Sequence, residues 1–326
     1  MKEIFPYKKS IDSKVVKAAS EILGVPVISS SRLKGGVVNY VYKLKTAERT
    51  VVVKVFRNRF WPEDGKLQWI EKQFAKHKVP HAKMIYYSRN NKYFLFGLMI
   101  SEYVAGLNAM EAVKKGVHTM ADSYKATGNL LKRVHKIKLK KFGQINYGKG
   151  TDSNFINREL KKATGLIEKL IHHKNLKHEI LNKFISAVRN GLEPFKKRFK
   201  PVLIHGDATR DNSILANNGE FILIDWDNAK SNIALWDYFV LTSWWPIGPE
   251  FKNPAKKKEL KQAFFDGYGR SGFTNDEIEH IEPAIHLLIY AAVMDFFLFN
   301  KKDYKSFGQT RKQFEHIIRK IKIKNL

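Results

Sequence analysis

Two short apolar segments, each ending in an acidic residue, constrain this chain more than any other feature. Residues 202–204 lead into the triplet His-Gly-Asp that ends at Asp207, and residues 221–224 lead into Asp225. Their length and β-branched content predict two buried strands. A polar loop between them carries Asn212, five residues after Asp207. A carboxylate that can hold a hydroxyl proton, an amide oxygen and a second carboxylate for Mg²⁺ are what phosphoryl transfer from ATP requires.

The alternative interpretation of this stretch is a β-hairpin with polar turn residues. Asp and Asn are common in turns because their side chains bond their own backbone. This would explain Asp211-Asn212 and residues 217–219, but not a His-Gly-Asp triplet followed by a second acid at this spacing. The spacing therefore favours a catalytic stretch over a structural hairpin.

Composition predicts an intracellular globular protein. The 326 residues suffice for one large unit or two lobes, and 44% hydrophobic content can fill a substantial core. The chain has no cysteine, which excludes disulfides, thiol catalysis and Cys-based zinc sites and fits a reducing setting. The N-terminus lacks the apolar segment of a signal peptide. Residues 283–299 are apolar but contain His286 and Asp295, so we expect a buried helix, no transmembrane segment and a cytoplasmic location.

The net charge of +28, from 59 basic and 31 acidic residues, raises the question of polyanionic partners. The lysines are dispersed over nearly every segment, which is typical of a solvated surface that also attracts nucleotide phosphates. No nucleic-acid reader motif accompanies the charge, so we expect no specific nucleic-acid binding. Residues 309–324 could form a basic amphipathic helix for a membrane or polyanion. A final helix packed on the body of the protein is the favoured alternative.

Extended segments dominate the first hundred residues. A helix is predicted over residues 12–23 and another over 62–77, with Pro62 in its first turn. Five strands are predicted as an antiparallel arrangement: residues 28–34, 37–44, 50–56, 84–87 and 93–103. Helical periodicity then takes over, with helices predicted over 121–136 and 155–198 and three more toward the C-terminus. We therefore predict an α+β fold with an N-lobe, residues 1–103, and a mostly helical C-lobe, residues 104–326.

Two features of the predicted N-lobe suggest contacts with phosphate. The turn at Gly35-Gly36 would let backbone amides approach an anion closely, although hairpins also need glycine. Lys54 lies on a strand that is apolar on both faces, where a lysine needs an anionic partner. Its position on the third strand favours a ligand of ATP phosphates over a snorkelling edge lysine. Glu63 lies on the apolar side of the following helix and is the predicted partner of Lys54, with Glu71 as the competitor.

These motifs together resemble the aminoglycoside phosphotransferase and choline kinase family, whose fold is that of protein kinases. The resemblance covers roughly residues 30 to 240. It rests first on His205-Gly206-Asp207-x4-Asn212 and Ile224-Asp225-Trp226-Asp227. Supporting matches are Gly35-Gly36-x2-Asn39, Lys54, Ser101-Glu102-Tyr103-Val104-x-Gly106, Leu131-x2-Val134-His135 and Ala234-Leu235-Trp236-Asp237.

The resemblance implies a role for each matched residue. Asp207 would be the catalytic base, and Asn212 and Asp225 would be the Mg²⁺ ligands. Lys54 would hold the ATP phosphates, while the backbone of Glu102, Tyr103 and Val104 would meet adenine. Asp237 resembles the aspartate that braces the catalytic loop, and Asp227 would be a further metal or structural carboxylate. His135 itself, on an apolar helix face, is expected to be a core histidine.

Two departures from protein kinases point to a small-molecule acceptor. Position 209 is Thr where protein kinases have Lys, and no activation segment with Ala-Pro-Glu precedes Asp237. We therefore predict an ATP- and Mg²⁺-dependent kinase for a hydroxyl of a small molecule. The rival is a nucleotide-binding module without transfer activity, whose hallmark would be loss of Asp207, Asn212 or Asp225. No acidic cluster is visible between residues 105 and 200, which favours a neutral or anionic acceptor over a polycationic antibiotic.

Overall fold

The first part of the protein is a five-stranded antiparallel sheet with strand order β1-β2-β3-β5-β4. The computed structural model describes residues 10–33, 38–243 and 253–320. The strands are β1 (Val27–Arg32), β2 (Tyr40–Thr46), β3 (Thr50–Val55), β4 (Met84–Ser88) and β5 (Leu98–Glu102). The predicted five-stranded antiparallel sheet is confirmed.

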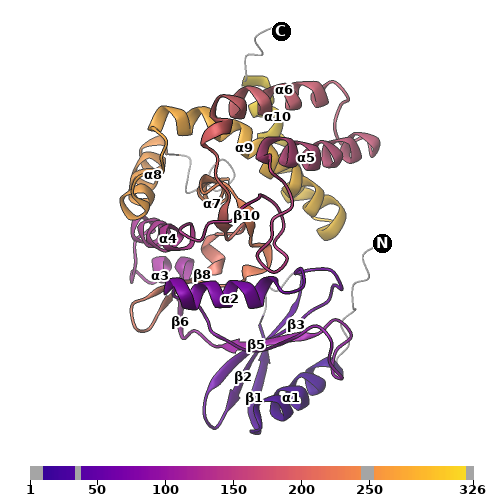
Figure 1. Ribbon diagram of the computed structural model, residues 1–326, viewed down its shortest axis with the longest axis vertical. Helices are drawn as coiled ribbons and strands as arrows, with labels where there is room; N and C mark the ends of the chain where they lie inside the picture. Colours follow the sequence, from indigo (N-terminus) through magenta and orange to yellow (C-terminus); the bar gives the residue numbers. More distant parts are fainter. Residues whose placement is uncertain (1–9, 34–37, 244–252, 321–326) are drawn as a thin grey trace.

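The two faces of this sheet have different partners. Helix α1 (Ser10–Leu23) packs on one face, where it buries Val15 and Ala19. Every second residue of β3 from Val51 to Val55 points to this face and belongs to the same apolar cluster. Successive side chains of a strand point to opposite faces, so Lys54 points to the other one. Helix α2 (Lys66–His77) covers that second face and lies between the sheet and the rest of the chain (Figure 1). The alternation of β3 thus directs a lysine toward the junction between the two parts.

The second part is mainly helical, as predicted (Figure 1). Its helices surround a large apolar core that continues under α2. They are α3 (Ala109–Lys114), α4 (Met120–Val134), α5 (Phe155–His172), α6 (Ile180–Leu192), α7 (Leu235–Thr242), α8 (Pro254–Tyr268), α9 (Asn275–Asp295) and α10 (Tyr304–Lys320), with a short 3₁₀ turn, η1 (Glu193–Arg198), after α6 and a π-helical turn, η5 (Phe296–Lys301), after α9.

The strands between residues 202 and 232 belong to two small sheets. Strand β7 (Val202–Ile204) pairs with β10 (Lys230–Asn232), whereas β9 (Phe221–Leu223) pairs with β8 (Ser213–Ala216), which in turn pairs with β6 (Gly106–Asn108). Two 3₁₀ turns, η2 (Arg210–Asn212) and η3 (Trp226–Asn228), complete the stretch. Both predicted strands exist, but they belong to different sheets. The stretch as a whole is therefore not one hairpin, although residues 217–219 do lie in the turn between the paired strands β8 and β9.

Helices α4 and α8 pack unusually closely because each has a glycine at the crossing. A Cβ on Gly128 would lie 2.2 Å from the carbonyl oxygen of Phe264, and one on Gly267 would lie 2.0 Å from that of Lys125. Real Cβ atoms do not come so close, so only glycine allows the two backbones this approach. The crossing positions the C-terminal ends of both helices, where His135 and Tyr268 meet.

Residues 275–301 form the one stretch in the described part of the chain that is long and apolar enough to cross a membrane. More than half of its most apolar window, 56%, is buried inside the protein, as in the core helix predicted for residues 283–299. Helix α10 packs on α9 and α6 and buries Phe314 and Ile318. Its apolar stripe is used inside the fold, which is the alternative favoured from the sequence.

The structure corrects two predicted boundaries in the first part. Helix α2 begins at Lys66, not at residue 62, because Gly65 before it has a φ of +70°, a left-handed conformation that a helix cannot contain. Strand β5 begins at Leu98 because Gly97 has a φ of +89° and lies against the backbone of Ser88. Gly35 and Gly36 of the predicted phosphate-binding turn lie outside the described residues.

Candidate active site

The residues predicted for catalysis line one large cavity between the sheet and the helical part. Lys54 reaches it from β3, Asp207 and Asn212 from the segment after β7, and Asp225 from the end of β9. The cavity has a volume of about 1330 Å³, enough for a nucleotide and a second small molecule. Segments up to 171 residues apart in the sequence thus meet at one place.

A buried carboxylate fixes the backbone of the His-Gly-Asp triplet. Asp237 on α7 is fully buried and accepts hydrogen bonds from the N–H groups of His205 at 2.8 Å and Gly206 at 2.7 Å. His135 donates a third hydrogen bond to it from Nε2, at 3.1 Å, and Nδ1 of His135 lies 2.8 Å from the Tyr268 hydroxyl. These donors, above all the one from His135, outweigh burial and lower the pKa of Asp237. Asp237 therefore braces the loop, and His135 is a satisfied core histidine, as predicted.

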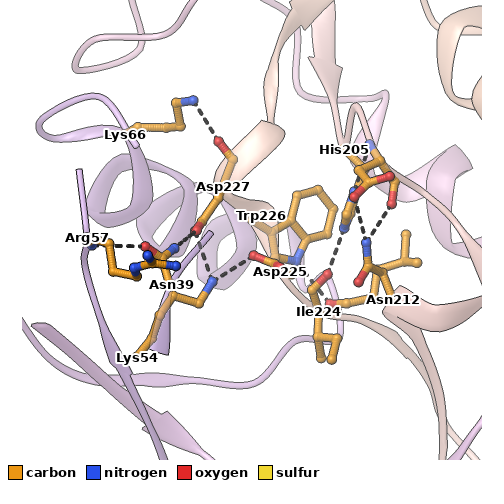
Figure 2. Close-up of polar contacts among 12 residues, drawn as sticks. Asn39, Lys54, Arg57, Lys66, His205, Asn212, Ile224, Asp225, Trp226 and Asp227 are labelled. Carbon is orange, nitrogen blue, oxygen red and sulfur yellow. Dashed lines mark hydrogen bonds and ion pairs between the residues drawn. The ribbon is translucent and has the colours of Figure 1, made fainter. Parts of the chain in front are cut away.

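The triplet requires both its histidine and its glycine. Gly206 has a φ of +77°, and a Cβ there would lie 2.5 Å from the carbonyl oxygen of Asn228. His205 donates from Nε2 to the carbonyl of Ile224 at 2.9 Å and accepts the N–H of Asp207 on Nδ1 at 3.2 Å. These two bonds define a neutral imidazole, consistent with burial, which lowers its pKa. His205 thus ties Asp207 to the segment that follows β9 and carries Asp225. Figure 2 shows the bond from His205 to Ile224.

Asp207 lies in an environment suited to holding a proton. The Nδ2 of Asn212 donates to its carboxylate at 3.0 Å and to its carbonyl oxygen at 2.9 Å. Burial and the charge of Asp225 raise the pKa of Asp207 to about 7, against hydrogen bonds from Asn212 and Asn228 that lower it. A carboxyl group poised near neutral pH is suited to general base chemistry.

Lys54 joins two carboxylates that follow β9. Its Nζ lies 2.7 Å from Asp225 Oδ1 and 3.0 Å from Asp227 Oδ1 (Figure 2). Burial alone would lower the pKa of Lys54, but the two carboxylates outweigh it and raise the pKa. Asn39 on the loop before β2 donates to Asp227 Oδ2 at 2.7 Å. The sheet and the catalytic segment are therefore connected through charged side chains.

The two carboxylates differ in their surroundings. The side chain of Asp225 is 50% exposed, whereas that of Asp227 is 1% exposed. Burial and the neighbouring Asp225 raise the pKa of Asp227 to about 6, while the attraction of Lys54 outweighs burial and lowers the pKa of Asp225. Asp227 is thus a structural carboxylate inside the protein, and Asp225 presents its charge to the cavity.

The predicted pair between Lys54 and Glu63 is wrong. Because α2 begins only after Gly65, Glu63 lies in the preceding loop and forms an ion pair with Lys66. Lys66 is fully buried and also donates to the carbonyl of Asp227 at 3.0 Å. The competitor, Glu71, pairs with His81 at 3.1 Å. Lys54 therefore takes both of its partners from the catalytic segment.

The connector between the two parts contains the residues predicted to meet adenine. Glu102, Tyr103 and Val104 line a separate hollow of about 400 Å³. The N–H of Glu102 bonds the carbonyl of Lys83, and that of Tyr103 bonds the carbonyl of Thr50. Within the described residues the backbone N–H and C=O of Val104 make no hydrogen bond. Val104 thus offers both a donor and an acceptor.

The donors available for Mg²⁺ come from two residues. No group of three or more His, Asp and Glu side chains in the described part of the chain is placed to hold a metal ion. Mg²⁺ at nucleotide sites needs only one or two protein oxygens, since phosphates and water complete its shell. Asp225 offers a half-exposed carboxylate. Asn212 is held through Nδ2, and its Oδ1 accepts no hydrogen bond from any described residue. This donor set fits a nucleotide-bound Mg²⁺.

Three side chains at or beneath the cavity have contacts that the sequence does not predict. Asn39, which the sequence marks only as part of a motif, donates to Asp227. Lys66 and Lys230 are buried lysines at the cavity or beneath it. The sequence around these two lysines does not indicate that they are buried, because the chain has 59 basic residues. Their burial follows only from the tertiary arrangement.

The protein consists of an antiparallel sheet joined to a helical part. A loop with one acid, a lysine and a second acid meet between the two parts. This is the architecture of kinase-like phosphotransferases. A sequence model of the phosphotransferase enzyme family matches residues 29–277. The chain therefore belongs to the phosphotransferase enzyme family. The resemblance drawn from the motifs and the prediction of a small-molecule kinase are both confirmed.

Solved structures share the fold at low sequence identity. Aminoglycoside phosphotransferase APH(4)-Ia, in a ternary complex with AMP-PNP and hygromycin B, matches with a TM-score of 0.69 and 14% identity over 94% of this chain and 98% of that chain. Choline kinase LicA from Streptococcus pneumoniae matches with a TM-score of 0.66 and 16% identity over 95% and 99%. Spectinomycin phosphotransferase APH(9)-Ia, in complex with ADP and spectinomycin, has a TM-score of 0.62 and 13% identity over 97% and 99%. No curated protein sequence matches the chain.

Proposed function

We propose that this protein transfers the γ-phosphate of Mg²⁺-ATP to a hydroxyl group of a small molecule. The observation that carries the proposal is the convergence of Asp207, Asn212, Asp225 and Lys54 on one cavity. A nucleotide-binding module without transfer activity would not need Asp207 fixed beside Asn212 with its pKa raised to about 7. Structures of the same fold contain AMP-PNP or ADP, which supports a nucleotide in this cavity.

Each side chain then has a defined task. Asp207 orients the acceptor hydroxyl and takes its proton as transfer proceeds. Lys54 contributes positive charge to the ATP phosphates, and Asn212 and Asp225 hold Mg²⁺. The bound Mg²⁺ supplies charge neutralisation on the phosphates. Asp237 and His205 act through the backbone of the loop and keep Asp207 in place.

The nucleotide is held by the first part of the chain. Val104 in the connector has an unused N–H and C=O that suit the adenine edge, and Glu102 and Tyr103 directly precede it in the chain. We place the division between the nucleotide-binding lobe, residues 1–103, and the lobe with the catalytic loop, residues 104–326, directly after β5. A cytoplasmic location is part of the proposal because ATP is its substrate.

The phosphotransfer proposal is tested with Asp207→Asn and Asn212→Ala. Asp207→Asn is nearly isosteric and should keep Mg²⁺-ATP binding, seen as a thermal shift, while turnover falls roughly 10²-fold or more. Asn212→Ala should weaken the metal-dependent part of the thermal shift. Turnover is measured as ADP release with an accepted alcohol. Wild-type turnover in Asp207→Asn would refute the role of Asp207, and a wild-type protein without any Mg²⁺-ATP shift would refute nucleotide binding.

A further inference from the structure

The cavity continues past the catalytic loop into a chamber with a largely apolar wall. Helices α5, α7 and α9 and the turn η5 supply this wall, which includes Leu166, Val240, Leu288, Ile289 and Phe296. The nucleotide ligands lie at the other end, on β3 and after β9. The chamber is therefore the place for the acceptor, and its wall fits an apolar molecular body.

A buried lysine lines this cavity next to the catalytic loop. Lys230 lines the cavity, is only 9% exposed, and lies two residues after Asn228, which bonds Asp207. Its backbone is paired with Ile204, just before the His-Gly-Asp triplet. Its Nζ lies over the ring of Trp236 at 4.1 Å. The architecture that fixes Asp207 therefore also fixes Lys230.

The charge of Lys230 has no close counter-ion. Its ammonium makes no hydrogen bond within the described residues, and its one ion-pair contact there is with Glu159 Oε1 at 4.0 Å. That carboxylate oxygen is already in contact with Arg158 and, at 3.3 Å, accepts a hydrogen bond from Asn232. A buried ammonium without a hydrogen-bonded partner is costly to the fold. Consistent with this, burial lowers the pKa of Lys230 to about 8.

Within the described part of the chain, no carboxylate other than Glu159 forms an ion-pair contact with Lys230. Asp303, at the rim, accepts hydrogen bonds from the N–H and hydroxyl of Ser306, which begin α10. Lys162 and Lys301 also line the cavity. The described carboxylates beside the apolar wall, Glu159 and Asp303, are thus both engaged with other groups, while Lys162 and Lys301 add positive charge.

Next to Lys230 lies an unused hydrogen-bond acceptor. Gly143 and Ser231 exchange two backbone hydrogen bonds of 2.8 Å, which sets the following residue, Gln144, beside Lys230. Gln144 lines the cavity, and its Oε1 is buried without a hydrogen-bond partner in the described part of the chain. Because this oxygen has almost no exposed surface, the group that the pair offers to a ligand is the cation of Lys230.

We infer that the acceptor is an alcohol with an apolar body and an anionic group, such as a hydroxy carboxylic acid, and that Lys230 binds the anionic group. The inference rests on the proposed phosphotransfer and specifies its substrate class. An anion on Lys230 supplies the counter-charge that Glu159 does not, and the apolar wall covers the body of the molecule while the hydroxyl meets Asp207.

The test uses alcohols in matched triplets: a hydroxy acid, its methyl ester and the corresponding amine. The smallest triplet is 4-(hydroxymethyl)benzoate, its methyl ester and 4-(aminomethyl)benzyl alcohol, and larger bodies extend the series. ADP release with saturating Mg²⁺-ATP should favour the acid over the ester at least tenfold in kcat/KM. Lys230→Met should raise KM for the acid about 10- to 100-fold, the range for a lost hydrogen bond to a charged group, with little change in kcat.

The matched control is Lys161→Met, which removes one charge from the exposed side of α5 beside the chamber and should leave KM unchanged. Melting temperatures of the variants separate loss of fold from loss of binding. If Lys230→Met does not fold, the preference of the wild-type protein among acid, ester and amine still tests whether the acceptor is anionic. A panel in which esters or amines are preferred, or in which no acid is used, overturns the inference. An unchanged KM for the acid in folded Lys230→Met also overturns it. ADP release with any alcohol of the panel, measured beside the thermal shift with Mg²⁺-ATP, tells whether the proposed phosphotransfer fails as well.

Discussion

Replacing Lys54 by methionine should destabilise the protein, and a second substitution at Asp227 should restore most of the loss. Lys54 is the cation shared by Asp225 and Asp227. Removing one partner of a buried ion pair costs about 3–5 kcal/mol because the other charge remains buried. Asp227 keeps its hydrogen bond from Asn39, so we expect the lower end, about 3 kcal/mol.

The difference in exposure predicts which second substitution rescues. With its side chain 1% exposed, Asp227 cannot be rehydrated, whereas Asp225 at 50% can. Lys54→Met with Asp227→Asn should therefore recover most of the lost stability, and Lys54→Met with Asp225→Asn should recover little. Neither double variant should recover turnover, because the lysine needed by the phosphates is still absent.

Urea unfolding at pH 8 and pH 5.5 measures the effect. The pKa of Asp227 is already raised to about 6 with Lys54 present, and loss of Lys54 raises it further. Since this folded-state pKa lies above the unfolded one, the native state prefers the protonated acid, and the deficit of Lys54→Met should shrink as pH falls from 8 to 5.5. A variant as stable as wild type at pH 8, or equal rescue by both double variants, would refute the ion-pair argument.

Three further predictions concern the loop and the last helix. Gly206→Ala should lower both melting temperature and turnover, since its Cβ would meet the Asn228 carbonyl at 2.5 Å in a left-handed conformation; a variant with wild-type turnover contradicts this. Asp237→Asn should cost roughly 1–3 kcal/mol in urea unfolding, because one buried N–H loses its acceptor, and should lower kcat more than it raises the KM for ATP. The apolar stripe of α10, including Phe314, is buried, so the protein should not sediment with neutral lipid vesicles at physiological salt; pelleting would contradict the packed position of α10.

The sequence predicted those parts of the site that are encoded locally. Asp207, Asn212 and Asp225 fall within 19 residues, and two short strands and a glycine in the same stretch help to position them. Lys54 could be found because a charge on an otherwise apolar strand is unusual. The apolar alternation and the turn residues predicted the five antiparallel strands in the same way, but not that β5 would lie between β3 and β4.

Side-chain contacts between segments that are distant in the sequence could not be predicted. Helical periodicity placed Glu63 on the inner side of α2, but the left-handed Gly65 starts the helix later, and a φ value is not visible in the sequence. The partners of Lys54 lie 171 and 173 residues away. Lys230 looked like one more surface lysine, because only the pairing of β10 with β7 carries it into the interior.

The close crossing of α4 and α8 has a consequence for variation far from the reaction. His135 at the end of α4 and Tyr268 at the end of α8 meet at 2.8 Å, and His135 in turn holds Asp237. A side chain larger than hydrogen at Gly128 or Gly267 would push the two helices apart and release this relay. Inherited or selected changes at these two glycines should therefore behave as loss-of-function alleles, although every residue of the candidate active site is intact.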